Sequence, residues 1–368
     1  MNLTALLADF FERHAPLSPL DRILVSFSGG PDSTALLLGL AQLSQRRPAP
    51  LSLLAFHLDH GLDPGSGDRA AAAGRTAAAL ALPFRAERRE VRSLRLPGES
   101  LEVAARRVRY ALLAEVAREI GARYVATAHH RGDQAETVLL RLLFGSGLTG
   151  LSGIRPVSIV GGSGGAVLLR PLLAAPRSAL MVAVEAAGLT PADDPTNRDL
   201  RQPRNRVRHQ LLPALSATHP GPPSLEESLA RLARRAAGAS RRLAALLAER
   251  LGPLPTPGGT SISRLGFERL PEALRAFALA AVHRQAGAPY PASAQARAEL
   301  LRQLARPGRV GCDCGGGWRW EGRGRGENRR LLLRPPSRRA VSPGFTYTSQ
   351  MPVEIFRERS GEVRTDGT

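Results

Sequence analysis

The chain has 368 residues, with 51 basic residues against 32 acidic ones and a formal net charge of +19. All of the basic residues are arginine, because the sequence contains no lysine. This excess favours a polyanionic partner such as a nucleic acid, although a GC-rich genome would by itself explain the choice of arginine. The sequence has no uncharged apolar run of about 18 residues. It also lacks a signal-peptide pattern, so we expect a cytoplasmic protein with no membrane partner.

The first half of the chain alternates short apolar runs with helical segments. Strands are expected over residues 23–27, 51–58, 84–91, 124–128 and 167–170. Helices are expected over residues 34–43, 70–82, 101–120, 134–144 and 176–188, with a flexible glycine-rich turn at 161–165. This alternation predicts an α/β fold, with a parallel twisted sheet covered by helices on both faces. Ligands of such sheets bind at the carboxyl ends of the strands.

The second half begins after residues 219–223, where three prolines and a glycine interrupt the chain. Helices are expected over residues 225–251, 265–285 and 293–304, and a small β-hairpin within the glycine-rich segment 309–334. We therefore expect a catalytic domain over 1–216, a smaller, mainly helical domain that contacts RNA over 217–334, and a flexible tail over 335–368. Cys312 and Cys314 supply too few ligands for structural zinc and are interpreted as incidental.

The strongest chemical signal is the loop Ser28-Gly29-Gly30-Pro31-Asp32-Ser33, which follows the first expected strand and opens a helix. Its glycines let the backbone approach an anion, and its hydroxyl groups and the helix N-terminus supply donors for phosphate. Asp32 would repel phosphate unless a Mg²⁺ ion bridged the two groups. The loop is no Walker A motif, which requires a lysine. It resembles the pyrophosphate loop of the PP-loop ATPases, which cleave ATP between the α and β phosphates and adenylate a substrate oxygen.

Further segments resemble the tRNA(Ile)-lysidine synthetase family, in the family's order, over residues 20–215. They are residues 57–62, 102–110, 127–137, 139–143, 145–147, 170–173, 194–197 and 204–209. Other PP-loop classes fit less well, because the chain lacks the N-terminal cysteine of asparagine synthetases and the cysteines of thiolases near the loop. One departure is visible: the family has two acidic residues before the glutamine, where this chain has Gly132-Asp133. Any metal role in this segment therefore rests on Asp133.

The resemblance implies an enzyme that uses ATP and Mg²⁺ to join L-lysine to C2 of the wobble cytidine of tRNA(Ile) with a CAU anticodon. An adenylated base would be the intermediate, and AMP and pyrophosphate the products. The implied ATP-binding residues are Ser28, Gly29, Gly30, Pro31, Asp32, Ser33, His57 and Thr127. The implied catalytic residues are Asp32, His129, His130, Asp133 and Glu136, with Asp32 and Asp133 as metal ligands. The implied tRNA-binding residues are Arg201, Arg204, Asn205, Arg206 and Arg208.

Structural alternatives stand beside these assignments. Glu136 also fits an ordinary first-turn helix acid, and one of the two adjacent histidines a packing role. His57 and His60 fit a role in shaping a turn, and the arginine-rich segments, including the pairs at 234–235 and 241–242, fit solvated faces. At the level of function, the alternatives are a PP-loop ligase for a different tRNA base and a catalytically idle RNA-binding protein. A homodimer is compatible with the sequence, which does not fix the oligomeric state.

Overall fold

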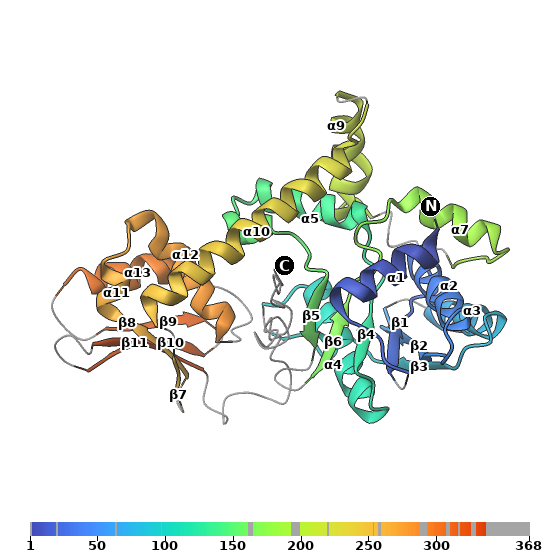
Figure 1. Cartoon of the computed structure of the whole chain (residues 1–368), viewed down its shortest axis with the longest axis horizontal. Helices are drawn as coiled ribbons and strands as arrows, with labels where there is room; N and C mark the ends of the chain where they lie inside the picture. Colours follow the sequence, from blue (N-terminus) through green and yellow to red (C-terminus); the bar gives the residue numbers. More distant parts are fainter. Residues whose placement is uncertain are drawn as a thin grey trace, which may run out of the picture.

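The computed structural model forms two bodies connected by one long helix (Figure 1). It describes residues 2–19, 21–62, 65–96, 98–160, 165–192, 199–218, 221–252, 254–256, 259–286, 293–306, 310–315, 317–324 and 329–335. The expected tail beyond residue 335 and most of the expected glycine-rich turn, residues 161–164, lie outside these ranges. No helix in these ranges is long and apolar enough to cross a membrane.

The first body is built on a six-stranded sheet with the order β3-β2-β1-β4-β6-β5. The strands are β1 (Arg22–Ser26), β2 (Ser52–Asp59), β3 (Phe84–Arg88), β4 (Tyr124–Ala126), β5 (Val157–Val160) and β6 (Ala166–Leu169). All neighbours pair in parallel except the edge strand β5, which pairs antiparallel with β6. The parallel α/β sheet expected from the sequence is thus confirmed. Strands β2 and β3 lie on one side of β1, and the chain then crosses to place β4 on its other side. The boundary between β1 and β4 is therefore the position where sheets of this kind form a ligand-binding crevice.

Helices cover both faces of this sheet. Consecutive side chains of β1 point to opposite faces, and they are buried on both. Ile23 and Val25 join the core beneath the helices α1 (Leu3–His14), α2 (Pro31–Gln45), α3 (Ser66–Ala79) and α7 (Arg177–Ala186). Leu24, between them in the chain, joins the opposite core under α4 (Leu101–Glu119). The apolar strand is therefore buried on both sides, which fixes its register and the position of the loop that follows it.

A third group of helices extends from the end of the sheet. It comprises α5 (Arg131–Leu143), α6 (Leu148–Leu151), α8 (Pro203–Arg206), the π-helix η2 (Val207–Leu211), α9 (Leu212–Thr218) and α10 (Leu225–Leu251). Ala135, Val138, Val207, Leu229 and Ala233 form a shared core among α5, η2 and the first half of α10. The last turns of α10 pack instead in the second body, to which they contribute Leu247 and Leu251.

The second body contains helices, as expected, together with a sheet that is larger than the expected hairpin. Its antiparallel sheet has the order β7-β8-β11-β10-β9, with β7 (Leu254–Thr256), β8 (Gly259–Ser263), β9 (Gly311–Gly315), β10 (Trp318–Arg323) and β11 (Arg330–Arg334). The helices α11 (Arg264–Glu268), α12 (Glu272–Gln285) and α13 (Ala294–Leu304) cover it around the fully buried Trp320. The single helix expected over 265–285 is interrupted before Pro271, since proline cannot continue a helix.

Candidate functional site

The loop between β1 and α2 has the backbone of an anion-binding turn. Gly29 has φ = 80°, a left-handed conformation that favours glycine, and a Cβ there would lie 3.1 Å from the Cβ of Ala73. The Oγ atoms of Ser28 and Ser33 are 3.1 Å apart, and Ser33 Oγ also donates to the carbonyl of Gly30 at 2.9 Å. Helix α2 starts at Pro31 without a side-chain cap. Its first N–H groups therefore remain available to a phosphate.

The loop is fixed at both of its ends by backbone contacts. The N–H of Phe27 donates to the carbonyl of Phe56 on β2 at 2.8 Å, and the N–H of Ala192 donates to the carbonyl of Gly29 at 2.9 Å. His57 Nδ1 contacts the carbonyl of Phe27 at 3.0 Å, so this nitrogen carries the ring proton. Burial lowers the pKa of His57, which favours its neutral form. This contact supports the turn-shaping interpretation of His57.

His130 lies between the two carboxylates that the sequence assigns to Mg²⁺. Its Nε2 is 3.7 Å from Asp32 Oδ2 and 3.6 Å from Asp133 Oδ2, so both acids face one nitrogen although they begin different helices. The N–H of Gly132 donates to His130 Nδ1 at 3.0 Å. A neutral ring therefore carries its proton on Nε2, directed toward the carboxylates. The ends of β1 and β4 thus converge on a single polar centre.

Gly132, at the position where the resemblance implies a second acidic residue, lies against the ring of His130. A Cβ at position 132 would lie 2.7 Å from Cε1 of His130, so any side chain there would displace the ring. His130 also caps α5, while Asp133 Oδ2 accepts the backbone N–H of His130 at 2.9 Å. His130 and Asp133 together therefore close the first turn of α5.

Asp133 is buried but stays ionised. Burial opposes its charged form, yet the electrostatic effects of His130 and Arg204 outweigh the burial, and those of His129 and the hydrogen bond from the His130 N–H act in the same direction. Together they lower the pKa of Asp133 to about 2. Arg204 donates to Asp133 Oδ1 at 2.7 Å. The carboxylate is therefore negative throughout the physiological pH range.

Glu136 lies one helical turn beyond Asp133 and is 2% exposed. Arg204 Nε donates to Glu136 Oε2 at 2.7 Å, and Arg208 Nε donates to Glu136 Oε1 at 2.5 Å. Arg208 Nη2 also lies 3.3 Å from Asp133 Oδ1. Two acids on α5 thus face two arginines spaced one turn apart across α8 and η2. We call these four residues the acid–arginine cluster.

The other proposed tRNA-binding residues lie outside this cluster. Arg201 is 91% exposed at its side chain and pairs with Asp199. Asn205 donates to the carbonyl of Asp199, and Arg206 Nη1 reaches the carbonyl of Leu200 at 3.5 Å. The preceding segment 194–197, one of the family-like segments, lies outside the described residues. The basic segment therefore divides into two groups. Arg204 and Arg208 face the acids of α5, whereas Arg201, Asn205 and Arg206 contact residues 199–200.

His129 and Thr127 follow β4 at the same edge. Thr127 Oγ1 and His129 Nδ1 are hydrogen-bonded at 3.0 Å. Burial lowers the pKa of His129 well below its usual value, and the charge of Arg170 lowers it further. His129 is therefore a neutral imidazole at pH 7.

Two arginines near the site were not among the residues assigned a function from the sequence. Arg177 Nε donates to Asp32 Oδ1 at 3.2 Å from the start of α7. Arg170, 2% exposed, donates to the carbonyl of Arg155 and to Ser158 Oγ. Arg170 lies in a family-like segment, which offered a signal, whereas the position of Arg177 depends on how α7 packs against α2.

The donor set suits a Mg²⁺ ion that is shared with a nucleotide. Mg²⁺ in such sites takes one or two carboxylates and completes its shell with phosphate oxygens and water. Asp32 meets this requirement because its partly exposed carboxylate stands at the start of α2, beside the phosphate loop. Asp133 faces the same histidine nitrogen, but Arg204 and a backbone N–H already engage its oxygens.

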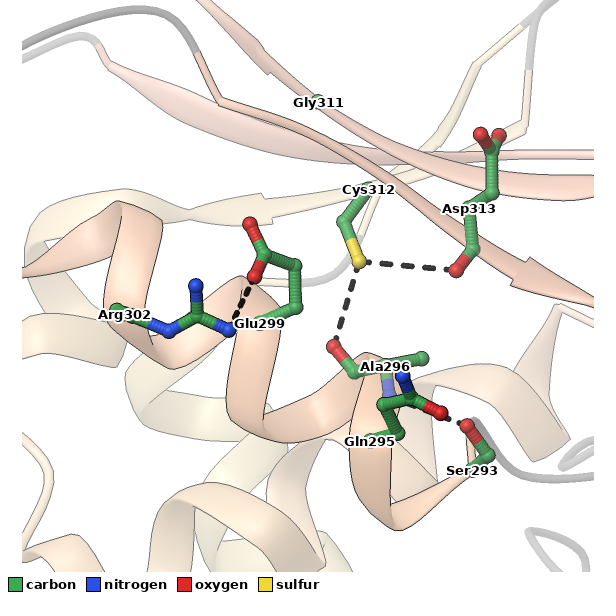
Figure 2. A pocket seen from close by; sticks show the side chains of 8 residues that line it. All are labelled: Ser293, Gln295, Ala296, Glu299, Arg302, Gly311, Cys312 and Asp313. Carbon is green, nitrogen blue, oxygen red and sulfur yellow. Dashed lines mark hydrogen bonds and ion pairs between the residues drawn. The ribbon is translucent and has the colours of Figure 1, made fainter.

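A cavity of about 410 Å³ lies elsewhere, in the second body between α13 and β9 (Figure 2). Its wall includes the ion pair Glu299–Arg302 and the buried Cys312, whose Sγ donates to the carbonyl of Ala296 at 3.3 Å. Burial raises the pKa of Cys312, which keeps it a thiol. No group of three or more potential metal ligands occurs among the described residues. This cavity therefore has no part in the polar centre of the first body.

Comparison with known proteins identifies the family. Residues 2–215 match the PP-loop domain family. The chain is 48% identical over 211 residues to a tRNA(Ile)-lysidine synthase of Symbiobacterium thermophilum, a match spanning 56% of this chain and 42% of that protein. It is 38% identical to enzymes of the same name from Bradyrhizobium sp. and Methylobacterium nodulans, over 79% and 80% of this chain and 82% and 86% of theirs.

Solved structures agree at the level of the fold. A U34-tRNA thiolase of Methanococcus maripaludis superposes with a TM-score of 0.52 at 17% identity, over 63% of this chain and 77% of the thiolase. The sheet order, the loop after β1 and the sequence matches lead to one assignment. The chain belongs to the tRNA(Ile)-lysidine synthase family of PP-loop ligases.

Proposed function

We propose that this protein joins L-lysine to C2 of the wobble cytidine of tRNA(Ile) with a CAU anticodon, in the cytoplasm, at the expense of ATP. One observation carries the proposal: the PP-loop and the acid–arginine cluster meet at the carboxyl ends of the adjacent strands β1 and β4, with His130 between Asp32 and Asp133. A phosphate-binding loop and the acid–arginine cluster thus share one crevice, where ATP, the base and the lysine amine would have to meet.

In the first step, the base oxygen O2 attacks the α-phosphorus of ATP, and the bond to the bridging oxygen of pyrophosphate breaks. The residues 28–33 would hold the phosphates through backbone N–H groups and the hydroxyls of Ser28 and Ser33. Asp32, with Asp133 beside it, would hold a Mg²⁺ ion, which when bound offsets phosphate charge. His130, which caps α5, would lie between the two carboxylates.

In the second step, the lysine ε-amine attacks C2 and AMP leaves with the O2 atom. The substrate arrives as an ammonium ion, so it needs a negative surface and a proton acceptor. Glu136 and Asp133 are the carboxylates proposed to face the amine, and Arg204 and Arg208 hold them in place. His129, held by Thr127 at the end of β4, is the proposed proton acceptor. A direct contact of Arg204 or Arg208 with tRNA remains a prediction.

The proposed tRNA surface continues from the crevice along α10. Arg234, Arg235, Arg241 and Arg242 are exposed on this helix, and none forms an ion pair with another described residue. Helix α10 packs on α5, which carries Asp133 and Glu136. Unpaired arginines beside the catalytic helix support binding of the phosphate backbone, which positions an RNA without reading its sequence.

The test is incorporation of radiolabelled lysine into an unmodified tRNA(Ile) transcript with a CAU anticodon, in the presence of ATP and Mg²⁺. We expect label in the tRNA, with AMP and pyrophosphate released in equal amounts. Asp32→Asn should abolish both, whereas Asp313→Asn, an exposed acid of the second body, should leave both unchanged.

The other outcomes separate the alternatives. ATP cleavage at the α-phosphate with tRNA bound but unlabelled would point to a ligase for a different base or nucleophile. Binding of tRNA without any ATP cleavage would point to an idle RNA-binding protein.

A further inference from the structure

Arg177 is the first residue of α7 and reaches the phosphate loop from a neighbouring helix. Its Nε donates to Asp32 Oδ1 at 3.2 Å, and Asp32 is the second residue of α2. Helices α2 and α7 pack against each other on one face of the sheet (Figure 1). The N-terminal ends of both helices therefore border the loop, and Arg177 brings a positive charge between them.

Local forces do not favour an arginine at this position. A cation in the first turn opposes the helix dipole, which prefers acids there. Helix α7 has no acid in its first turn and no side-chain cap, so the charge is not compensated within the helix. The pair with Asp32 is partly exposed, at 49% for Arg177 and 29% for Asp32, so it contributes little to stability. The stability of the fold thus does not account for Arg177.

The phosphate loop itself lacks a positive side chain. Many phosphate loops include a lysine, but this chain contains none. The donors within the loop are backbone N–H groups and the hydroxyls of Ser28 and Ser33, and Asp32 adds a negative charge. Arg177 brings a guanidinium into contact with Asp32 of the loop.

We propose that Arg177 binds the pyrophosphate portion of ATP and stabilises pyrophosphate as it leaves, an inference that rests on the proposed use of ATP. The guanidinium would turn from Asp32 to phosphate oxygens, which it can bind in a bidentate manner. When the bond between the α-phosphorus and the bridging oxygen breaks, its electron pair passes to pyrophosphate. Arg177 offsets this added charge. The same movement releases the Asp32 carboxylate for a metal ion.

The test compares Arg177→Ala and Arg177→Lys with Arg118→Ala, a matched control at an exposed arginine near the end of α4. Binding of pyrophosphate, ATP and AMP to each protein is measured by calorimetry, with and without Mg²⁺. We expect Arg177→Ala to weaken binding of pyrophosphate and ATP by roughly tenfold or more, because a charge-assisted hydrogen bond is removed. AMP binding and the melting temperature should not change, and Arg177→Lys should restore part of the affinity.

Two results would overturn the proposal. Unchanged pyrophosphate affinity with an altered Mg²⁺ requirement would mean that Arg177 only positions Asp32. Equal reductions in AMP and pyrophosphate affinity would mean that the substitution distorts the whole site. A failure of the lysidine assignment is separable, because a wild-type protein that binds pyrophosphate through Arg177 without labelling tRNA would retain this inference and lose the proposed substrate.

Discussion

Arg208 Nε lies 2.5 Å from Oε1 of Glu136, a residue 72 positions earlier in the chain. Arg204 reaches the other carboxylate oxygen, so a buried acid is held between two guanidinium groups supplied by α8 and η2. The π-helix at Val207–Leu211 shifts the helical phase directly after Arg206, and Arg208 lies within it. Single π-helical turns within α-helices are frequent at functional sites.

Glu136→Gln should separate lysine binding from ATP binding. The substitution keeps the volume of the side chain but leaves Arg204 and Arg208 facing a neutral amide. We expect a decrease of about 1–3 kcal/mol in the free energy of unfolding, measured by urea denaturation. The KM for lysine should rise by roughly tenfold or more, with unchanged affinity for ATP. Glu115→Gln, an exposed acid of α4, is the control. An unchanged lysine KM in the variant would exclude Glu136 from the amine site.

Asp133 should make the fold sensitive to acid. Its pKa is about 2 in the folded protein, against about 3.9 in an unfolded chain. Because the pKa is lower in the folded protein, the ionised carboxylate stabilises the fold above about pH 4, and this stabilisation is lost as the pH falls toward 2. It amounts to about 2 kcal/mol. Asp133→Asn should therefore flatten the pH dependence of the free energy of unfolding between about pH 5 and pH 2. A variant with the same acid profile as the wild type would contradict this role.

His129→Asn should slow lysine transfer more than adenylation. Asparagine preserves polarity but accepts no proton, so we expect the transfer rate to fall by about 100-fold. Pyrophosphate release in a single turnover should stay close to the wild-type rate. Because burial lowers the pKa of His129, the wild-type transfer rate should show no titration of this group near pH 6.5. A transfer rate equal to the wild type would assign the histidine to packing.

The exposed arginines of α10 should act on tRNA affinity and not on turnover. Replacing Arg234, Arg235, Arg241 and Arg242 together by alanine should weaken tRNA binding and lower the salt dependence of log K by about 0.7–0.9 for each phosphate that is no longer neutralised. The rate at saturating tRNA should be retained. Filter binding at salt concentrations between about 50 and 200 mM measures the slope of log K against log[salt]. An unchanged slope would mean that α10 presents a solvated face only.

Gly29→Ala tests the backbone of the phosphate loop. Its positive φ and the 3.1 Å approach to Ala73 make any Cβ there strained. We expect weaker ATP binding and a cost of about 1 kcal/mol or more in the free energy of unfolding. Gly67→Ala provides the matched control, because this glycine lies in α3 with open space around its Cβ position. Stability of that variant should be unchanged or slightly higher.

The sequence predicted the strand, loop and helix around residues 28–33 well because this unit is local. A strand, a glycine turn and a helix start are consecutive, so the geometry of residues 28–33 depends mainly on neighbours in the chain. The expected helix over 134–144 starts three residues earlier in the structure, at Arg131, because the cap formed by His130 and Asp133 is a tertiary detail. The helix over 265–285 was expected to be continuous despite Pro271, which underestimated the effect of a proline.

Two features depend on distant parts of the chain and could not be read from its pattern. The basic segment 201–208 was interpreted as a tRNA contact, yet two of its arginines face Glu136, and no periodicity reveals a partner some 70 residues away. The five-stranded sheet was underestimated because β7 and β8 flank prolines and glycines, and β9 is rich in glycine. Strand β8 pairs with β11, about 70 residues later in the chain, and this distant pairing stabilises a strand that its own composition does not indicate.

Helix α10 has a further consequence for the size of the substrate. Its 27 residues form one continuous helix from the core beneath α5 to the core around Trp320. At about 1.5 Å per residue, the helix is roughly 40 Å long and fixes the distance between the two cores. Each residue added to it would also rotate the second body by about 100° relative to the crevice. The length and the angular phase of this helix therefore set which RNA shapes can touch both bodies at once.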